Sequence, residues 1–446
     1  MEKLKVGIIS LGCDKNRVDS EIVLDKLGRS YTITNNPKDS DIILVNTCGF
    51  IESSKQESIN TIIEMSEYKK GKGKCKVIVV TGCLTQRYGK ELQELLPEAD
   101  VILGVNDYDK LEEAIDRALV NNEKSIYCNY SDVNINEGER VLTTSKHYAY
   151  VRIGEGCSNF CTYCAIPRIR GKYRSRKIES VLEEVKSLGA QGVKEIILVA
   201  QDTTRYGIDL YNEKMLPELI REISKIDDIK WIRVLYCYPE EITDELINEI
   251  KVNDKVCKYL DIPVQHISNN VLKLMGRRGR KEEIVNVIQR LRQEIPGMAI
   301  RTSLIVGFPG ESESDFEELK EFVRDTKIDK LGVFRYSQEE GTPAAEMENQ
   351  IDEEIKEKRE KEIMVIQQEN SYEINKNKVG KIYEVVVENF DSEYYIGRNY
   401  EMTPEIDGAI YFKCDKILNI GDFVKVKIEQ NLEYDLMGVV YYESSK

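Results

Sequence analysis

Three cysteines lie within eight residues of one another in the stretch GEGCSNFCTYCAIP, namely Cys157, Cys161 and Cys164. A 4Fe–4S cluster that only carries electrons is bound by four cysteine thiolates, and a structural zinc ion also takes four protein ligands. Three thiolates on one tight loop can bind three irons of a cubane and leave the fourth iron open. The spacing therefore predicts a cluster at which a substrate or a cofactor binds.

The spacing C-x3-C-x2-C, with Tyr163 before the last cysteine, is typical of radical S-adenosylmethionine enzymes. In these enzymes the cofactor chelates the open iron, and an electron from the cluster cleaves its sulfonium to give a 5′-deoxyadenosyl radical. The cofactor performs the chemistry, while the protein supplies binding and orientation. The alternatives are a zinc knot or buried reduced cysteines, and the position of the loop at the end of a strand disfavours both.

Another three cysteines are spread over the first hundred residues, where Cys13, Cys48 and Cys83 each follow a strand-like apolar run. In open parallel sheets, ligands bind outside the carboxyl ends of the strands, so these cysteines are expected to meet at one sheet edge. Buried cysteines at strand ends are also common, and spacing alone leaves a packing role open. A glycine that lets backbone approach a bulky inorganic core adjoins each cysteine: Gly12, Gly49 and Gly82.

The patterns between these cysteines predict an α/β fold in several parts. Residues 1–120 alternate near-continuous apolar strands with helical patterns, which indicates an open parallel sheet covered on both faces. Residues 121–146 are polar and are predicted to be a linker. Residues 147–348 contain six strand–helix units, which predict a partial (βα)6 barrel of the TIM type with its site at the carboxyl strand ends.

The last hundred residues change character. Residues 349–378 are rich in Glu, Lys and Gln and are predicted to form a solvated connecting helix. Residues 379–446 contain short β-runs separated by Gly, Asn and Asp, a pattern typical of a small antiparallel β-barrel.

Composition limits the possible functions. The chain has 446 residues, which indicates two or three domains. Lys and Arg number 64 against 79 Asp and Glu, so the net charge of −15 argues against general nucleic-acid binding and suits a basic partner. No apolar run approaches the ~18 residues of a membrane span, and no signal peptide is evident, so a cytoplasmic protein is expected. The 11 cysteines favour metal binding over a disulfide framework.

A few other residues are candidates for binding the cofactor, and the first is Tyr163 between the last two cysteines of the C-x3-C-x2-C motif. Gln265 follows the run YLDIPV and is a candidate hydrogen-bond partner for the ribose or carboxylate of the cofactor, whereas a structural role is expected for the adjacent His266. Gly307 in LIVGFPGE would let backbone approach the adenine. No catalytic residue is predicted beyond the cluster cysteines. The remaining cysteines belong to no constellation and are expected to be core or surface thiols: Cys75, Cys128, Cys237, Cys257 and Cys414.

The basic run RIRGKYRSR directly follows the loop that carries Cys157, Cys161 and Cys164, which we call the radical-type loop. It is either a contact for a carboxylate of the substrate or the cofactor, or a solvated loop, and the sequence leaves both open. Its basic residues are Arg168, Arg170, Lys172, Arg174 and Arg176.

Nearly the whole chain resembles the methylthiotransferases of the radical S-adenosylmethionine class, and within them the branch that modifies a ribosomal protein. All six cysteines of the two sets occupy positions that bind clusters in that family. Family members more often have Pro where this chain has Asp14. The motifs that carry the resemblance are LGCDKNRVDSE, NTCGFIESSKQES, GCLTQRY, EGCSNFCTYCAIPRIRGKYRSR, LVAQDTTRYGIDL, YLDIPVQH, RTSLIVGFPGE, LGVFRYSQEEGTPAA and PEIDG.

The resemblance implies an N-terminal methylthiotransferase domain, a radical barrel and a C-terminal TRAM barrel. It implies two 4Fe–4S clusters, S-adenosylmethionine and an external electron donor. It also implies the reaction, which adds a methylthio group to the β-carbon of an aspartate in a strongly basic small-subunit ribosomal protein. An unactivated C–H bond resists acid–base attack, so a radical is the reasonable route, and a second open cluster could hold the sulfur.

Two other functions remain as alternatives. A non-enzymatic electron carrier has no use for an open iron, but a tRNA adenosine methylthiotransferase shares the architecture. Residues 375–446 contain 9 Lys and Arg against 13 Asp and Glu. A barrel that grips RNA should be basic, so the acidic balance favours a basic protein substrate. The loop YEMTPEIDG is expected to expose three acidic side chains that steer such a substrate: Glu401, Glu405 and Asp407.

Overall fold

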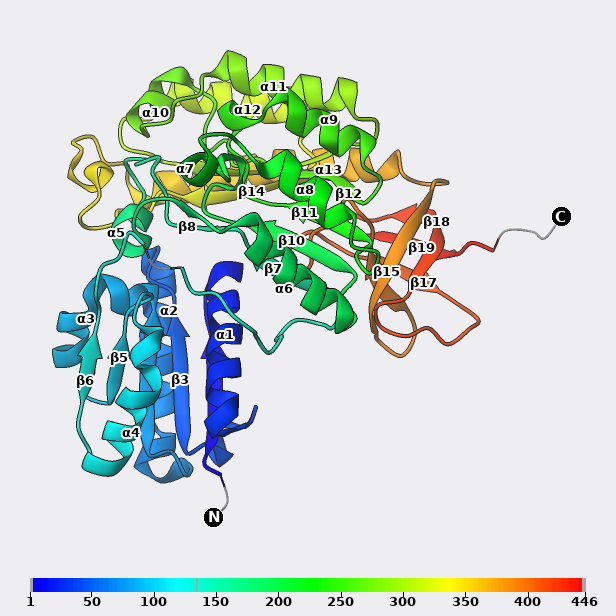
Figure 1. Cartoon of the computed structure of the whole chain (residues 1–446). Helices are drawn as coiled ribbons and strands as arrows, with labels where there is room; N and C mark the ends of the chain where they lie inside the picture. The colour runs from blue at the N-terminus through cyan, green and yellow to red at the C-terminus, as the bar shows by residue number, and fades with distance from the viewer. Residues whose placement is uncertain (1–2, 134, 443–446) are drawn as a thin grey trace.

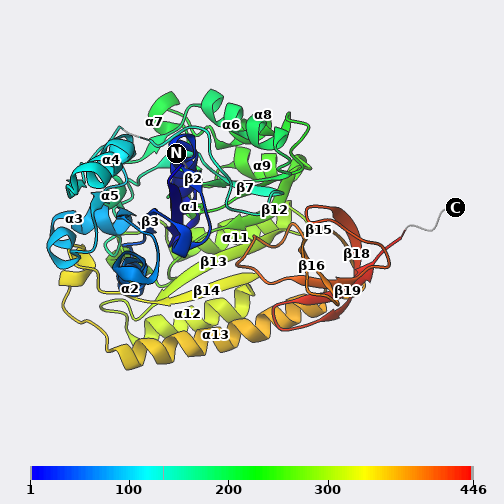
Figure 2. The same ribbon diagram turned by 90° about the horizontal axis from the view of Figure 1, so that it is seen from below.

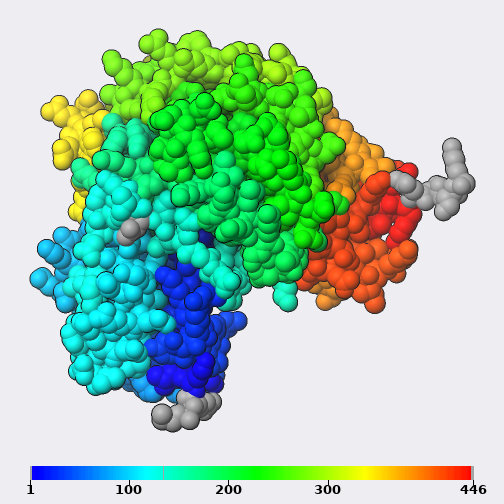
Figure 3. Space-filling view, in the orientation of Figure 1, coloured from blue at the N-terminus to red at the C-terminus, as the bar shows by residue number. Residues whose placement is uncertain are grey.

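The computed structural model describes residues 3–133 and 135–442. It contains two parallel sheets and a small closed barrel (Figure 1). The central domain contacts both others, which form two lobes on different sides of it (Figure 3). The predicted α/β fold class, with an open parallel sheet, a partial barrel and a small β-barrel, is confirmed.

The N-terminal sheet has six parallel strands in the order β2-β1-β3-β4-β5-β6. Apolar clusters on both faces bury it under its helices. The strands are β1 (Lys5–Ser10), β2 (Thr32–Ile33), β3 (Ile42–Thr47), β4 (Val77–Gly82), β5 (Val101–Leu103) and β6 (Ser125–Tyr127). The helices are α1 (Asp14–Ser30), α2 (Glu52–Ser66), α3 (Cys83–Leu95) and α4 (Leu111–Asn121).

The predicted linker 121–146 is in part a structural element. Its residues Ser125–Tyr127 form β6, which pairs with β5 and completes the N-terminal sheet. The expectation was wrong there because a polar edge strand has a weak apolar pattern. Beyond β6 the chain runs to the central domain along the interface, where Arg140 pairs with Glu21 of α1 at 3.1 Å.

The central sheet has the sequential order β14-β13-β12-β11-β10-β7, and all neighbouring strands are parallel. This order is that of a barrel opened between its first and last strands. The strands are β7 (Tyr148–Arg152), β10 (Glu195–Val199), β11 (Trp231–Val234), β12 (Val256–Asp261), β13 (Ala299–Val306) and β14 (Lys330–Arg335). The longer helices after them are α6 (Ile178–Ala190), α8 (Leu216–Ser224), α9 (Asp244–Val252), α11 (Lys281–Glu294), α12 (Glu313–Thr326) and α13 (Glu353–Lys376).

Short elements line the carboxyl ends of these strands. They are β8 (Gly154–Glu155), α5 (Ile166–Arg170), β9 (Arg174–Ser175), α7 (Ile208–Tyr211) and α10 (Asn269–Leu274).

Successive residues of the central strands enter different cores, because side chains alternate between the faces of a sheet. Ala149 and Val151 of β7 pack outward under the helices. Tyr148 and Tyr150 point to the concave face, where they join Val18 of α1. In Figure 2, α1 lies across the concave face of the central sheet. The N-terminal domain therefore docks by inserting its first helix into the open side of the barrel.

The helix that follows β14 is a packed part of the barrel. Ile363 and Ile366 of α13 belong to the main core of the central domain, and Gln367 donates to the backbone oxygen of Ile328 at 2.9 Å. The predicted solvated connecting helix was therefore wrong in character, although α13 lies within the range 349–378. The helix is polar overall, but a narrow apolar stripe on one side is sufficient to cover one strand.

The C-terminal domain is a closed barrel in the order β15-β16-β17-β19-β18. Its strands are β15 (Ile382–Phe390), β16 (Tyr395–Arg398), β17 (Ile410–Lys413), β18 (Phe423–Asn431) and β19 (Leu436–Val440). The pairs are antiparallel except that β17 and β19 run parallel. The expectation of an antiparallel barrel thus needs this one correction. The pairing of β17 with β19 closes the barrel and joins strands that are not consecutive in sequence, so no local pattern predicts its direction.

Buried ion pairs attach the C-terminal barrel to the central sheet. Arg398 of β16 and Arg233 of β11 both pair with Glu195 of β10, and all three side chains are almost fully buried. Trp231, the only tryptophan, packs edge-on against Phe423 with ring centroids 4.8 Å apart. This interface combines charge neutralisation with aromatic contact.

The loop YEMTPEIDG lies in this interface and is not an acidic surface. Asp407 accepts a hydrogen bond from the Tyr259 hydroxyl at 2.6 Å, and Glu401 pairs with Lys378 at 2.6 Å. Glu405 stays partly exposed but accepts two bonds from Arg17 of α1. The predicted steering role of these three carboxylates was therefore wrong, because their charges are neutralised within the chain.

Within the described ranges 3–133 and 135–442, no helix is both long and apolar enough to span a membrane.

We predict that Asp407→Lys will detach the C-terminal barrel. The substitution places a cation beside Arg301, whose Nε lies 3.5 Å from the carboxylate of Asp407, and loss of a buried partner costs about 3–5 kcal/mol. Thermal denaturation followed by the fluorescence of Trp231 measures the effect. Glu393→Lys is the control, because Glu393 is exposed in the same barrel and such changes cost about 0.5 kcal/mol or less. Equal melting of the two variants would contradict the interface described.

Candidate functional site

The first set of cysteines gathers where three adjacent strands of the N-terminal sheet end. Cys13, Cys48 and Cys83 follow β1, β3 and β4, which are neighbours in the order β1-β3-β4. Each lies within electrostatic range of the other two. Cys48 and Cys83 are buried, whereas Cys13 is exposed. The structure thus brings together three thiols that the sequence separates by 70 residues, and leaves one open to solvent.

Asn16 in the first turn of α1 holds the three cysteine loops together. Its Nδ2 donates to the backbone oxygens of Leu11 at 3.1 Å and Thr47 at 3.0 Å. Its Oδ1 lies 3.6 Å from the sulfur of Cys83. The side chain is fully buried. One amide therefore contacts the segments that carry all three cysteines, and sequence reasoning gave no signal for it.

Glycines allow the close approach of these loops. A Cβ on Gly12 would lie 2.8 Å from the Cβ of Cys48, and the backbone there has a φ of 86°. A Cβ on Gly49 would lie 2.7 Å from the backbone of Leu84, next to Cys83. These contacts support the expectation that the glycines serve the cysteine cradle.

Asp14 occupies the first position of α1, directly after Cys13. Pro is favoured there because its φ suits the helix start, and an acidic residue is favoured by the helix dipole. Its Oδ1 accepts a hydrogen bond from the Tyr236 hydroxyl at 3.2 Å. Asp14 and the Pro that is more common in the family at this position are thus both favourable at the start of a helix.

The second set of cysteines lies on a loop that is anchored to several strand ends. The Cys157 amide donates to the backbone oxygen of Gly171 at 3.0 Å, and the Thr162 amide donates to that of Met275 at 2.9 Å. Phe160 adopts a left-handed φ of 52° and is exposed. The loop therefore curls over the carboxyl end of the central sheet, where the sequence placed it.

Burial keeps most of these thiols protonated in the absence of a metal. It raises the pKa of Cys83 to about 12, although the nearby Arg170 guanidinium opposes the shift. It raises the pKa of Cys157 to about 11, and it also raises those of Cys48 and Cys164. A metal must displace these protons when it binds, so the affinity of both sets for iron increases with pH.

The predicted cofactor-binding residues differ in their environments. Tyr163 packs edge-on against Phe308 at 6.3 Å, and burial raises its pKa well above the usual value. Gln265 lies past the end of β12 with a left-handed φ of 70°, and its backbone bonds to β13. Gly307 also has a positive φ, but a Cβ there would lie 2.2 Å from Lys356 of α13. Both the positive φ and the close contact with α13 favour glycine at this position.

Arg277 is a neighbour of the radical-type loop that sequence reasoning missed. Its guanidinium lies 4.2 Å from the ring centroid of Tyr238, whose hydroxyl is 3.7 Å from the sulfur of Cys161. Its Nη2 donates to the backbone oxygen of Pro263, but its buried Nη1 has no hydrogen-bond partner among the described residues. A buried, unsatisfied cationic nitrogen could bind the carboxylate of a cofactor.

The basic run after this loop is divided between surface and interior. Arg168 and Lys172 are exposed, whereas Arg170, Arg174 and Arg176 are buried. Arg170 bonds to carboxylates of its own chain, namely Asp19 and Glu155. Neither expectation for the run was right as a whole, because Arg170 and Arg176 pair with acids of the chain while Arg168 and Lys172 lie at the surface.

The two cysteine sets lie on elements that pack against each other. Cys83 at the start of α3 forms an apolar cluster with Ala165 and Ile169, which belong to the segment that follows Cys164. Helices α3 and α5 are in direct contact. The carboxyl edges of the two parallel sheets therefore face each other across one interface, with a set of thiols on each side.

The donor sets suit iron–sulfur clusters by their chemistry. Each set supplies three cysteine thiols, and thiolates are the ligands that hold such clusters. Cys13 is exposed, so its set is open to solvent on one side. In the part of the chain that the structure describes, no three His, Cys, Asp or Glu side chains converge as in a site for a single metal ion.

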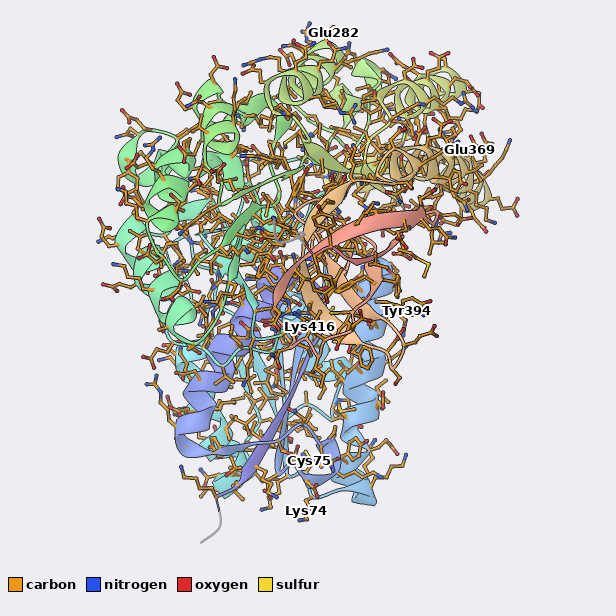
Figure 4. All side chains as sticks on the ribbon, turned by 90° about the vertical axis from the view of Figure 1, so that its right-hand side faces the viewer. Lys74, Cys75, Glu282, Glu369, Tyr394 and Lys416 are labelled. Atoms are coloured by element: carbon orange, nitrogen blue, oxygen red, sulfur yellow. The ribbon has the colours of Figure 1, made fainter. Side chains whose placement is uncertain are left out.

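The other candidates lie outside these sets. Cys75 precedes β4 and lies at the end of the N-terminal domain that is remote from the central sheet (Figure 4). His266 is fully buried, burial lowers its pKa to about 3, and its Nδ1 accepts from the Ser268 amide. The structural role expected of His266 fits this environment.

Comparison with known families divides the chain in the same way. Residues 5–104 match "Uncharacterized protein family UPF0004". Residues 151–323 match the Radical SAM superfamily, and residues 379–440 match the TRAM domain. The match to the Radical SAM superfamily implies a 4Fe–4S cluster and S-adenosylmethionine as cofactors.

Solved structures of low sequence identity share the fold. The radical S-adenosylmethionine methyltransferase TsrM from Kitasatospora setae aligns with a TM-score of 0.55 at 13% identity, covering 86% of this chain and 81% of that chain. The cobalamin-dependent radical enzyme OxsB aligns with a TM-score of 0.50 at 15% identity, covering 82% and 56%. These likenesses concern the fold alone.

Relatives of much higher identity match from end to end. Three of them are named ribosomal protein uS12 methylthiotransferase RimO. They come from Clostridium tetani, Clostridium botulinum and Clostridium acetobutylicum and are 64%, 66% and 60% identical to this chain. Each alignment covers all 446 residues and the whole of the relative. The chain therefore belongs to the RimO family of radical S-adenosylmethionine methylthiotransferases.

Proposed function

We propose that this protein adds a methylthio group to the β-carbon of an aspartate in the small-subunit ribosomal protein uS12. The observation that carries the proposal is the pair of thiol sets on the facing edges of two parallel sheets, in a chain that matches RimO proteins over its full length. In this proposal Cys157, Cys161 and Cys164 hold the cluster that binds S-adenosylmethionine. The auxiliary cluster is held by the first set: Cys13, Cys48 and Cys83.

When bound, these groups supply a radical that removes hydrogen from an unreactive carbon and a sulfur that replaces it. In this proposal the chain's own residues hold the two groups on opposite sides of the interface. Cys13 is exposed while its two partners are buried, so the auxiliary set is open on one side, where the target side chain can enter. Arg277, and more weakly Gln265, Tyr163 and Gly307, are the residues assigned to the cofactor.

The names of the relatives support a protein substrate, because the proteins that match over the full chain are named for uS12.

The alternative substrate is a tRNA adenosine. A barrel that binds RNA needs clustered cations for the phosphates, and the lysines of this barrel lie among acids. Lys413, for example, pairs with Glu393 at 3.3 Å. The proposal also includes an external electron donor for the clusters and a location in the cytoplasm, where ribosomal proteins are made.

Mass spectrometry of ribosomal proteins and tRNA from cells that lack this gene will test the substrate. We expect one aspartate of uS12 to lose a methylthio group while the tRNA modifications stay unchanged. Cells that carry the gene on a plasmid are the control and should regain the group. Loss of a tRNA methylthio group with uS12 unaffected would replace the proposal by its alternative.

Reciprocal alanine variants will separate the roles of the two cysteine sets. Replacing Cys157, Cys161 and Cys164 should abolish the release of 5′-deoxyadenosine, because the cofactor loses its iron, while the iron at the other set remains. Iron content and 5′-deoxyadenosine are measured on the reconstituted proteins.

The matched variant replaces the auxiliary set: Cys13, Cys48 and Cys83. It should still release 5′-deoxyadenosine but form no methylthiolated product, because the two sets belong to different sheets. Methylthiolation at the parent rate would show that the auxiliary set is only structural. Release of 5′-deoxyadenosine by the first variant would contradict the assignment of the radical set.

Arg277→Gln should weaken the binding of S-adenosylmethionine to the reconstituted enzyme. A hydrogen bond to a charged group contributes about 1.5–3 kcal/mol, so the dissociation constant should rise by about one to two orders of magnitude. Calorimetric titration with the cofactor is the measurement. Lys273→Gln, which removes an exposed cation four residues away, should leave the affinity unchanged. Equal affinities for parent and Arg277→Gln would exclude this contact.

A further inference from the structure

One arginine of the basic run bonds to both domains and reaches a sulfur of the auxiliary set. Arg170, the last residue of α5, is 2% exposed. Its Nη1 donates to Asp19 of α1 at 2.9 Å and to Glu155 at 3.0 Å. Its Nη2 donates to the Oδ1 of Asn16 at 2.7 Å and lies 3.5 Å from the sulfur of Cys83. The guanidinium thus has an ionic side and a side turned to the thiols.

The partners of Nη2 connect Arg170 to the whole auxiliary set. Asn16 accepts from Arg170 through the same oxygen that approaches Cys83. Its other side-chain atom, Nδ2, bonds to the loops that carry the remaining two cysteines. A displacement of Arg170 is therefore transmitted to all three loops. Cysteine thiolates that bind clusters are sensitive to hydrogen bonds from such neighbours.

Arg152 offers an internal comparison. Its Nη1 pairs with the same two carboxylates, with Asp19 at 2.5 Å and with Glu155 at 3.0 Å, and it is 1% exposed. Its Nη2 donates to the backbone oxygen of Asn136 at 2.6 Å, so this arginine turns away from the thiols. The two arginines share their charge, burial and ionic partners, but only Arg170 contacts Asn16 and Cys83.

We propose that Arg170 is a positioning residue for the auxiliary cluster, which it orients and tunes from the central domain. The inference rests on the proposed function, because it takes Cys83 as a ligand of that cluster. Arg170 lies six residues after Cys164, so the segment that supplies a ligand of the radical set also supplies the hydrogen bond to the auxiliary set. The state of one site is thereby linked to the docking of the domain that carries the other.

The direction of the effect follows from elementary electrostatics. A hydrogen bond to a ligand sulfur withdraws electron density from it and stabilises the reduced cluster, which raises the reduction potential. Lysine keeps the positive charge of arginine, but its single ammonium cannot reproduce a planar group with donors on two sides. Arg170→Lys therefore removes the contact with the sulfur without removing the charge.

The test uses the full chain in which Cys157, Cys161 and Cys164 are replaced by alanine, so that only the auxiliary cluster is present. Anaerobic redox titration followed by electron paramagnetic resonance gives the midpoint potential, and iron retention gives the affinity. We expect Arg170→Lys to shift the potential to a more negative value and to lower the affinity by about tenfold. Arg152→Lys should keep the parent potential, although both variants lose stability because both disturb the same ion pairs.

The outcomes distinguish a failure of the proposed function from a failure of this inference alone. A parent that binds no iron at the auxiliary set overturns the proposed function and this inference with it. A parent that binds iron, with equal potentials in Arg170→Lys and Arg152→Lys, overturns only the inference. Arg170→Gln, which also removes the charge, should shift the potential at least as far. If neither Arg170 variant folds while Arg152→Lys does, Arg170 is structural only and the inference fails.

Discussion

Asp19 and Glu155 lie buried between the first two domains, where each pairs with both Arg152 and Arg170. Two charges of each sign neutralise one another in a place from which water is excluded. Removing any one of them would leave an uncompensated buried charge, at a cost of about 3–5 kcal/mol. The N-terminal domain therefore cannot swing away from the barrel without a large penalty. The two sets of thiols depend on this arrangement for their position relative to each other.

The concave face of the barrel serves as the common support of the other domains. Helix α1 fills part of it, and Val386 of the C-terminal barrel reaches the same apolar cluster. Arg17 of α1 bonds to Glu405 of the C-terminal barrel, so the two outer domains also meet there. Helix α1 and the C-terminal barrel therefore share the concave face, while the two thiol sets lie at the carboxyl strand ends.

Charge in the sequence was a poor guide to surface function. Asp407 and Glu401 are acidic residues in a polar loop, a pattern typical of solvated turns, yet both are buried against cations of other elements. Arg170 lies in a run that was expected to be either solvated or in contact with a ligand. It instead pairs with two acids of the chain, one of which, Asp19, is more than 100 residues away in sequence. A charge pattern records the sign of a side chain but not the partner that neutralises it, since that partner is distant in sequence.

The sequence by itself determined the two parallel sheets, the six strand–helix units and the place of each cysteine at a strand end. Apolar periodicity and turn residues are local properties, so they can be read along the chain. The radical-type loop could also be recognised because its three cysteines are close in sequence. Only the tertiary structure decided that Asn16 joins three distant loops and that Arg170 connects the two thiol sets. It also decided that a buried nitrogen of Arg277, which packs on Tyr238, has no hydrogen-bond partner among the described residues. These contacts arise where separate domains meet, and their geometry depends on packing that no local pattern encodes.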